Sequence, residues 1–271
     1  MPELPEVETT RAGIEPHLLG QRVIEVKVYQ YKLRQPVTAG LAAGLKAKEI
    51  QSVERRGKYL LLKSVGGTAI IHLGMSGSLR LVDKDVPLEK HDHVEFLLEG
   101  GQSLRYRDPR RFGVVLWTTK DPMQHPLIAK LGVEPLEVGF DADYLYKIAQ
   151  QRSVAIKQLI MNGQVVVGVG NIYASESLFR AGIHPTRSAK RISRARCERL
   201  VVAIKSVLAE AIEQGGTTLR DFYNGAGEPG YFKQCLQVYG RGGEPCMQCN
   251  AVIRQIVQGQ RSTYYCGRCQ R

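Results

Sequence analysis

Three features of the sequence predict a multidomain α+β protein. Short apolar runs broken by Gly, Asp and Pro fill residues 20–120, which is typical of a β-sandwich. Over 153–224 the apolar residues recur at three- and four-residue spacing, which indicates helices. The last 26 residues hold four cysteines in two Cys-x-x-Cys pairs, which indicates a small module built around a metal. A chain of 271 residues is long enough for two domains or one large one.

The chain begins MPELPEVETT, and we expect a helix over residues 3–19. Pro5 suits the first turn of that helix, whereas Pro16 should kink it or end it early. Small second residues usually allow the initiator methionine to be removed, which would leave a secondary amine at Pro2. A free proline nitrogen is a nucleophile, and the positive end of the helix would favour its neutral form.

The strands of the first part are expected at the apolar runs RVIEVKVY, KYLLLK, TAIIHL, VEFLL and GVVLW. We place the first domain at 1–133. A linker follows at 134–152, where the stretch LGVEPLEVGFDADYL carries Pro135 and Gly139.

The helical part is expected at 153–236, and its clearest helix is ERLVVAIKSVLAEAIEQGG, which ends at a glycine pair typical of a C-cap. The stretch QVVVGVGNIYAS resembles a dinucleotide-binding turn, but Tyr173 occupies the third small position and no second βαβ unit follows. We therefore interpret Gly168, Gly170 and Asn171 as a tight turn. Its amides and the Asn side chain could hold a phosphate, or the turn could be purely structural.

The paired cysteines predict one structural Zn²⁺ per chain. Sixteen residues separate the two pairs, which is the spacing of two zinc knuckles: Cys246, Cys249, Cys266 and Cys269. A disulfide or a redox pair is the alternative, and the lack of an export signal in the chain argues against it. Cys197 and Cys235 have no such partners and are interpreted as ordinary thiols.

Between the knuckles, AVIRQIV and STYY are expected to form a β-hairpin with its turn near Gly259, within a last domain at 237–271. Zinc would replace the hydrophobic core that so short a module lacks. Arg261 lies at the tip of this hairpin, where a lone arginine is ordinarily just solvated.

The charge balance favours a polyanionic partner. Thirty-eight Lys and Arg against twenty-six Asp and Glu give a net charge of +12 and a pI near 9.5, which would attract phosphates. A merely basic protein is the alternative. No apolar run approaches the roughly 20 residues of a membrane span, and no signal peptide is evident, so we expect an intracellular protein with no membrane partner.

Motifs spread over the whole chain resemble the bacterial formamidopyrimidine-DNA glycosylases: PELPEVET, RGKYLLL, HLGMSGSLR, DPRRFG, VGVGNIYASE, QGGTTL, GYF and QVYGR, followed by the zinc knuckles. The resemblance implies an N-terminal helix and β-sandwich, a helix-two-turn-helix domain and a C-terminal zinc β-hairpin. It also implies a cytoplasmic, nucleoid-associated monomer that binds damaged double-stranded DNA.

The activity that the resemblance implies is that of a bifunctional DNA glycosylase and AP lyase in base excision repair. Such an enzyme excises 8-oxoguanine and formamidopyrimidines through a Schiff base and then cleaves the strand by β,δ-elimination. The implied catalytic residues are Pro2 as nucleophile, Glu3 as general acid, Lys58 for β-elimination and Arg261 for δ-elimination. Glu3 could instead only complement the helix dipole, and Glu6 could assist catalysis or cap the helix.

The resemblance also implies a wedge that fills the space of the extruded base, made of Met75, Arg110 and Phe112. The alternative is that Met75 and Phe112 are core residues, although glycines and Asp-Pro around them mark loops.

Three further positions match phosphate contacts of the family: His91, Arg152 and Asn171. A metal site at His91 and His93 is a weaker alternative, since no fourth ligand is evident. The segment QGGTTLRDFYNGAGEPGYF resembles the family's loop over the extruded base, though a plain surface loop has the same composition.

Two rival functions stay open. One is a noncatalytic damage-binding protein, which the joint presence of Pro2, Glu3 and Lys58 disfavours. The other is an endonuclease VIII-like glycosylase for oxidised pyrimidines, which the complete wedge set disfavours.

Overall fold

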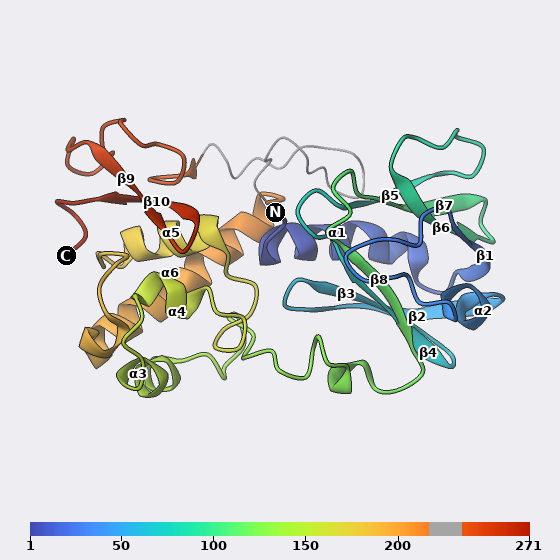
Figure 1. The fold of residues 1–271 in the computed structure, drawn as a ribbon, viewed down its shortest axis with the longest axis horizontal. Coiled ribbons are helices and arrows are strands. Elements are labelled where there is room, and N and C mark those ends of the chain that lie inside the picture. The colour runs from blue at the N-terminus through green and yellow to red at the C-terminus, as the bar shows by residue number, and fades with distance from the viewer. Residues whose placement is uncertain (217–234) are drawn as a thin grey trace. The chain divides into compact units, whose positions relative to one another are not determined.

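The structure is a computed structural model that describes residues 1–216 and 235–271 (Figure 1). The chain divides into two compact units. The described part of the first unit is 1–130 and 214–216, and that of the second is 131–213 and 235–271. Most of the predicted loop over the extruded base lies outside the described residues.

Helix α1 spans Leu4–Leu18, as predicted to within one residue at each end. Pro5 lies in its first turn, and Pro16 lies in its last turn, where only two further residues need helical geometry. The helix ends where Leu19 turns extended and donates its N–H to the Glu15 carbonyl at 3.0 Å. Its buried face packs against β2, β3 and β5 of the first unit.

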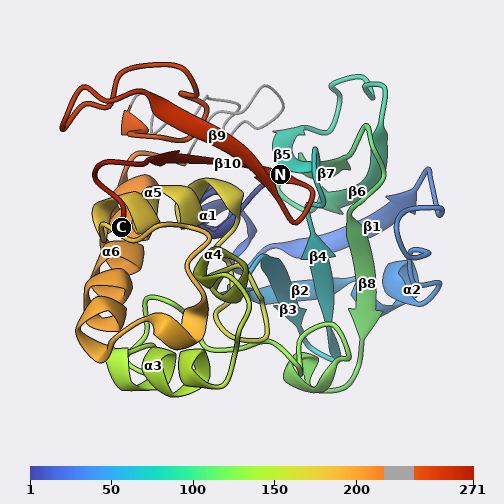
Figure 2. The ribbon, with the colours of Figure 1, turned by 60° about the vertical axis from the view of Figure 1, so that its left-hand side comes forward.

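The first unit is an eight-stranded antiparallel array in the order β5-β7-β6-β1-β2-β3-β4-β8. Its strands are β1 Arg22–Val28, β2 Lys48–Arg56, β3 Tyr59–Ser64, β4 Gly67–His72, β5 Ser78–Asp83, β6 Asp92–Leu98, β7 Gln102–Arg107 and β8 Val114–Thr118. Strands β1 and β2 share only two paired positions, so the array separates there into two halves that enclose a common apolar core (Figure 2). This is the predicted sandwich. The short helices α2 Leu41–Leu45 and η1 Pro122–Gln124 belong to the same unit.

The second unit is helical apart from one hairpin. Its helices are α3 Ala142–Gln150, α4 Ile156–Ile160, α5 Asn171–Arg180, η2 Ala189–Arg191 and α6 Arg194–Glu213. Helix α6 packs against α3 and α5 and ends, as predicted, just before Gly215 and Gly216, which have φ of 72° and 82°. The range predicted as a linker, 134–152, contains α3, which begins at Asp141, whose carboxylate accepts the Tyr144 N–H at 2.7 Å.

The predicted hairpin is confirmed as β9 Ile253–Gln258 and β10 Arg261–Cys266. Gly259 and Gln260 both have positive φ, 57° and 62°, as a two-residue type I′ turn requires. Strand β10 lies beside α5 (Figures 1 and 2). In the part of the chain that the structure describes, every helix is too short or too polar to span a bilayer.

Candidate active site and zinc centre

The N-terminus of α1 holds the predicted nucleophile and general acid. Pro2 is buried and precedes Glu3, whose side chain is also buried and which serves as N-cap of the helix. The Glu3 N–H donates to Glu6 Oε2 at 2.8 Å. Of the two roles considered for Glu6, the structure therefore shows the cap. This bond fixes the backbone next to Pro2 at the positive end of the helix.

Lys58 lies in the turn between β2 and β3, directly after Gly57, which has φ of 58°. Arg55 anchors this turn to α1, because its guanidinium donates to Glu8 Oε2 at 2.7 Å and to the Gly57 carbonyl at 3.0 Å. The turn that carries Lys58 is thereby held to the helix that begins beside Pro2.

His72, at the end of β4, shares the surroundings of Lys58. Burial, and then the cations Lys58 and Arg34, lower the pKa of His72 to about 4, so the ring is neutral at pH 7. Its Nδ1 accepts the N–H of Gly74 at 2.9 Å. The neutral ring therefore orients the loop that leads to Met75.

The three wedge residues lie on two loops of the first unit. Met75 is 39% exposed and Phe112 is 45% exposed, so the alternative that they are core residues is wrong. The Arg110 guanidinium lies 5.0 Å from the centre of the Phe112 ring.

A buried carboxylate that the sequence analysis did not identify, Asp108, joins these two loops. It accepts from Ser76 Oγ at 2.9 Å in the first loop and from Gly113 N at 2.8 Å in the second. The Tyr106 hydroxyl donates to it as well, at 3.1 Å. Its signal in the sequence is an Asp before Pro at the start of a turn. A side chain at Gly74 would collide with the backbone of Phe112, so the loops are in contact.

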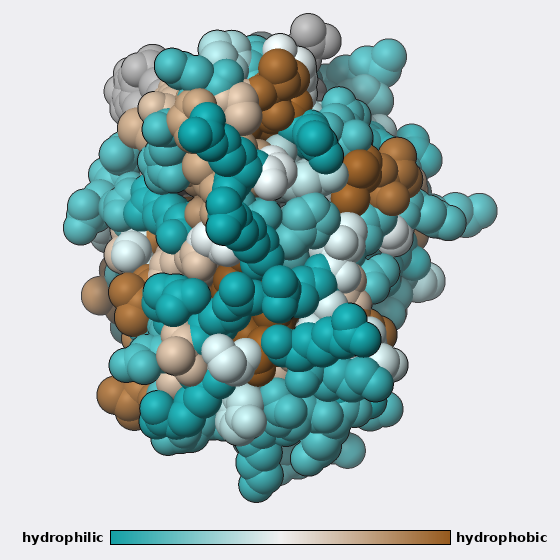
Figure 3. Space-filling view, turned by 90° about the vertical axis from the view of Figure 1, so that its left-hand side faces the viewer, coloured by the Kyte–Doolittle hydropathy of each residue, from teal (hydrophilic) through white to brown (hydrophobic). Residues whose placement is uncertain are grey.

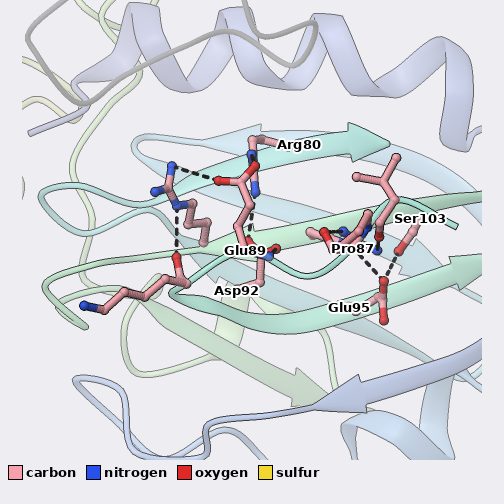
Figure 4. Close-up of polar contacts among 10 residues, drawn as sticks. Arg80, Pro87, Glu89, Asp92, Glu95 and Ser103 are labelled. Carbon is pink, nitrogen blue, oxygen red and sulfur yellow. Dashed lines mark hydrogen bonds and ion pairs between the residues drawn. The ribbon is translucent and has the colours of Figure 1, made fainter. Parts of the chain in front are cut away.

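His91 has φ of 78°, an unusual conformation that its surroundings hold in place. Figure 4 shows Arg80 paired with Glu89 and with Asp92, the latter at 3.0 Å, while the Glu89 N–H donates to Asp92 at 2.9 Å. Partial burial, and then nearby cations beginning with Lys90, lower the pKa of His91.

A second set of bonds holds the preceding part of this loop. Glu95 accepts from Ser103 at 2.8 Å and from Arg105 at 2.7 Å (Figure 4). Arg105 also donates to the Val86 and Pro87 carbonyls at 2.7 and 3.0 Å. The loop before His91 is thus fastened to β6 and β7.

The alternative of a metal site at His91 and His93 is wrong. The ring of His93 is buried and its Nε2 lies 2.8 Å from the Asp108 carbonyl. Among the described residues, the one group of His, Cys, Asp and Glu side chains that could hold a metal is the cysteine cluster.

In the second unit, Arg261 begins β10 at the hairpin tip and lines a hollow of about 200 Å³ together with Lys157, Gln158, Met161, Asn162, Gln258 and Gly259. Lys157 was also missed by the sequence analysis. Its ammonium is buried and donates to Asn171 Oδ1 at 2.6 Å and to Thr263 Oγ1 at 2.7 Å. A lysine among the apolar positions of AIKQLI was its only signal.

Asn171 begins α5, and its side chain joins that helix to the hairpin. Besides accepting from Lys157, it donates to the Ser262 carbonyl at 2.9 Å. These bonds give the Asn171 side chain a structural role. A phosphate contact by the backbone amides of the turn before it stays a prediction. Arg152 is exposed, just after α3.

The four cysteines predicted as ligands come together at the base of the hairpin, with all four sulfur atoms within 4.8 Å of one another. Two of the Sγ pairs are 3.9 and 3.5 Å apart, for Cys246 with Cys269 and Cys249 with Cys266. Zn–S bonds of about 2.3 Å in a tetrahedron place sulfurs roughly 3.8 Å apart, so the cluster fits Zn²⁺. No disulfide is present among the described cysteines.

Gln270 supports this cluster from outside. Its Oε1 accepts the Cys266 N–H at 2.8 Å, and its Nε2 donates to the Ile183 carbonyl at 2.9 Å. The second knuckle is thereby fixed to the loop after α5.

Fold and site together define a class of protein: a helix-two-turn-helix protein with an N-terminal catalytic module and a zinc finger. Residues 1–115 match the family model of the formamidopyrimidine-DNA glycosylase N-terminal domain. Residues 131–223 match the H2TH domain of the same enzymes, and 243–271 match the zinc finger found in FPG and IleRS.

Known proteins are similar over the whole length. Formamidopyrimidine-DNA glycosylases of Stutzerimonas stutzeri and Methylococcus capsulatus are 59% and 57% identical over 271 residues, covering 100% of both chains. The crystal structure of MutM (Fpg) from Thermus thermophilus matches with a TM-score of 0.90 and 37% identity, covering 99% of this chain and 98% of that one. Lactococcus lactis Fpg in complex with abasic-site DNA matches with a TM-score of 0.92 and 34% identity, covering 99% of each chain. The chain belongs to the formamidopyrimidine-DNA glycosylase family.

The predicted family, fold class and zinc site are therefore confirmed. The roles of the individual site residues and the domain boundaries stay predictions.

Proposed function

We propose that this chain excises oxidised purines from duplex DNA through a Schiff base at Pro2 and then cleaves the strand at the abasic site. The observation that carries the proposal is the N-terminus of α1, where Pro2 and Glu3 are both buried and the backbone between them and Glu6 is fixed. Relatives support the substrate class, since a point mutant of Lactococcus lactis Fpg has been crystallised with DNA containing Fapy-dG, and Lactococcus lactis Fpg with abasic-site DNA.

The first step requires a free amine, so removal of Met1 is part of the proposal. The Pro2 nitrogen attacks the sugar C1′, the bond from C1′ to the damaged base breaks, and the base leaves with the electron pair and takes up a proton. Glu3 protonates the ring oxygen as the sugar opens. A secondary amine has no further N–H to lose from the adduct, so the product is a cationic iminium.

Strand cleavage follows from that cation. The iminium withdraws electrons and acidifies the C2′ proton, whose removal expels the 3′ phosphate in β-elimination. A second proton loss then expels the 5′ phosphate in δ-elimination. Lys58 assists the first elimination, and Arg261, at the hairpin tip, assists the second by binding the 3′ phosphate.

Extrusion of the base depends on the exposed wedge. Met75 and Phe112 fill the vacated space in the stack, and the guanidinium of Arg110 interacts with the nearby DNA phosphates. His91, Arg152 and the turn before Asn171 contact phosphates. When bound, Zn²⁺ keeps the hairpin folded, and the four thiolates leave no open coordination position.

We infer that the protein acts as a monomer in the bacterial cytoplasm, in association with the nucleoid. Support comes from the proposed substrate, chromosomal DNA.

Borohydride reduction during incubation with an 8-oxoguanine duplex tests the proposal. A covalent adduct at Pro2 is expected, because borohydride reduces an iminium to a stable amine. Chemical blocking of the terminal amine, or retention of Met1, should abolish the adduct, whereas Pro16→Ala, which leaves the amine intact, should preserve trapping. An undiminished adduct in the blocked protein would overturn Pro2 and assign the Schiff base to a lysine.

The same trapping assay separates the rivals. A noncatalytic damage-binding protein would give no adduct on any duplex. An endonuclease VIII-like enzyme would be trapped faster on oxidised pyrimidines than on 8-oxoguanine.

A further inference from the structure

A cluster of arginines surrounds the base of the zinc hairpin, in the second unit. Two hollows lie there and share Arg271. One, of about 490 Å³, is lined by His184, Thr186, Arg187, Ser188, Arg191 and Arg271. The other, of about 440 Å³, is lined by Ala251, Val252, Arg254, Gly267, Arg268 and Arg271. We call the five arginines of the two hollows the C-terminal arginine surface.

These cations are not neutralised within the described residues. None of the five arginines pairs with a carboxylate there, whereas Arg180, Arg194 and Arg241 of the same unit pair with Glu210, Asp143 and Glu244. Holding like charges together without counter-charges costs free energy, which an anionic partner would offset.

The two hollows form one continuous surface. Both are lined by Arg271, and His184 lines the first. Burial, and then Arg187 of the first hollow and Arg254 of the second, lower the pKa of His184. The Arg254 guanidinium lies over Gly267, where an added Cβ would be 3.4 Å from its Cζ.

This surface is separate from the hairpin tip. Arg261 pairs with Gln258 at the turn, and Cys266 pairs with Ile253 at the other end of the ladder. Five residues of strand at about 3.3 Å each put roughly 17 Å between the two ends.

Figure 3 shows the side of the molecule on which the C-terminus lies in Figure 1. Hydrophilic side chains cover most of that face.

We propose that the C-terminal arginine surface binds the phosphate backbone of a DNA segment other than the one at the hairpin tip. Its permanently charged side chains are all arginines, whose planar guanidinium binds phosphate oxygens in pairs. An acidic protein segment would also be attracted, but it usually needs apolar anchors, and the lining offers only Ala251 and Val252. A second contact would keep the protein on DNA while the first surface releases one site and tests the next.

The inference rests on the proposed function only in that the protein acts on DNA, and it does not depend on the Pro2 chemistry.

The test compares the full-length protein with a variant that carries Arg187→Gln, Arg191→Gln, Arg254→Gln and Arg271→Gln. The control variant removes the same charge from exposed positions of the first unit: Lys46→Gln, Lys48→Gln, Lys84→Gln and Lys120→Gln. Melting temperatures check that both variants fold.

Titration with short undamaged duplexes of about 12 base pairs should give two bound duplexes per chain for the wild type and the control, and one for the arginine variant. On a duplex of about 40 base pairs, the arginine variant should bind at least tenfold more weakly near 0.1 M salt. Its log-log salt slope should be shallower by about 3.6 units if all four arginines contact phosphates, at about 0.9 per lost contact.

Single-turnover excision of 8-oxoguanine from a short duplex should be equal in all three proteins, which separates this inference from the proposed function. Equal stoichiometry and equal salt slope in the arginine variant and the control would overturn the inference. If, in addition, the arginine variant bound a polyglutamate peptide more weakly than the control did, the surface would be assigned to an acidic protein partner, and the inference would again be overturned.

Discussion

Phe112 and Met75 illustrate how exposure decides the role of a single residue. Both are large and apolar, a type that is usually found in cores, and the sequence alone left that alternative open. Their exposed fractions, 45% and 39%, contradict it, because a core residue would be nearly covered. Exposed apolar side chains on a loop, next to an arginine, are what the proposed insertion into DNA requires.

Phe112→Ala should therefore change the melting temperature by less than about 2 °C, in line with the small effect of surface substitutions. It should slow excision of 8-oxoguanine from duplex by tenfold or more, while trapping on a pre-formed abasic site changes far less, because that site has no base to expel. Val138→Ala, at a position that is 91% exposed, is the control. Equal losses on both substrates with a lowered melting temperature would mean that Phe112 supports the fold.

Asp108 and Lys157 show what a sequence cannot reveal about single residues. Each is a charged group that is buried, and its partners come from elsewhere in the chain, Ser76 for Asp108 and Thr263 for Lys157. No local pattern records such partners. Pro2, Glu3 and Glu6, in contrast, are close in sequence at the start of α1, so the sequence alone predicted their proximity.

Asp108→Asn should weaken the contact between the two wedge loops. The carboxylate of Asp108 accepts from Ser76 Oγ with one oxygen and from Gly113 N–H with the other. In asparagine an NH₂ group, which cannot accept, replaces one of these oxygens, so one of the two bonds is lost. We expect a loss of about 1–3 kcal/mol in the free energy of unfolding, from urea titration. Excision from duplex should slow more than trapping on abasic DNA. Asp85→Asn, at an exposed position, is the control, and an effect no larger than the control's would show that Asp108 does not hold the loops.

At the scale of elements, the strongest predictions came from apolar runs and turn residues. The runs at β3, β4, β6 and β8 are largely apolar, and in β1 apolar residues are interspersed with the charged Glu25 and Lys27. Strands β2, β5 and β7 were not singled out, because they carry several charged or polar residues. Helix α3 lies in a range that Pro135 and Gly139 marked as a linker, and its capping residue Asp141 was the overlooked signal. Knuckle spacing, in contrast, predicted all four members of the cysteine cluster, because zinc geometry dictates it.

Removal of one zinc ligand should unfold the hairpin without touching the amine. Cys249→Ser should release the metal, as measured by elemental analysis, and should weaken binding of damaged duplex by tenfold or more, because Arg261 loses its rigid support. Cys235→Ser is the control, since this thiol is exposed and lies outside the cluster. Normal binding and cleavage by the metal-free variant would show that the zinc is unnecessary.

At the scale of the whole molecule, the chain returns from α6 of the second unit to the first unit at Gln214, and Gly216 follows directly. Gly216 has φ of 82°, and a Cβ at this position would lie 3.1 Å from Glu6 Oε1. This return therefore runs against the carboxylate that caps α1 beside Pro2. Long-range packing of this kind was invisible in the sequence, where QGG indicated the end of a helix and the start of a loop.

Gly216→Ala should have two separable effects. The left-handed backbone conformation disfavours alanine by about 1 kcal/mol, and the new methyl group presses on Glu6. Gly20→Ala is a matched control, because Gly20 has φ of 75° and nothing lies within 4 Å of the added Cβ. Both variants should lose similar stability in urea titration, but only Gly216→Ala should slow borohydride trapping on abasic DNA, by fivefold or more, because the Glu6 cap fixes the backbone at Pro2. Equal trapping rates in the two variants would show that the position of Glu6 does not control the nucleophile.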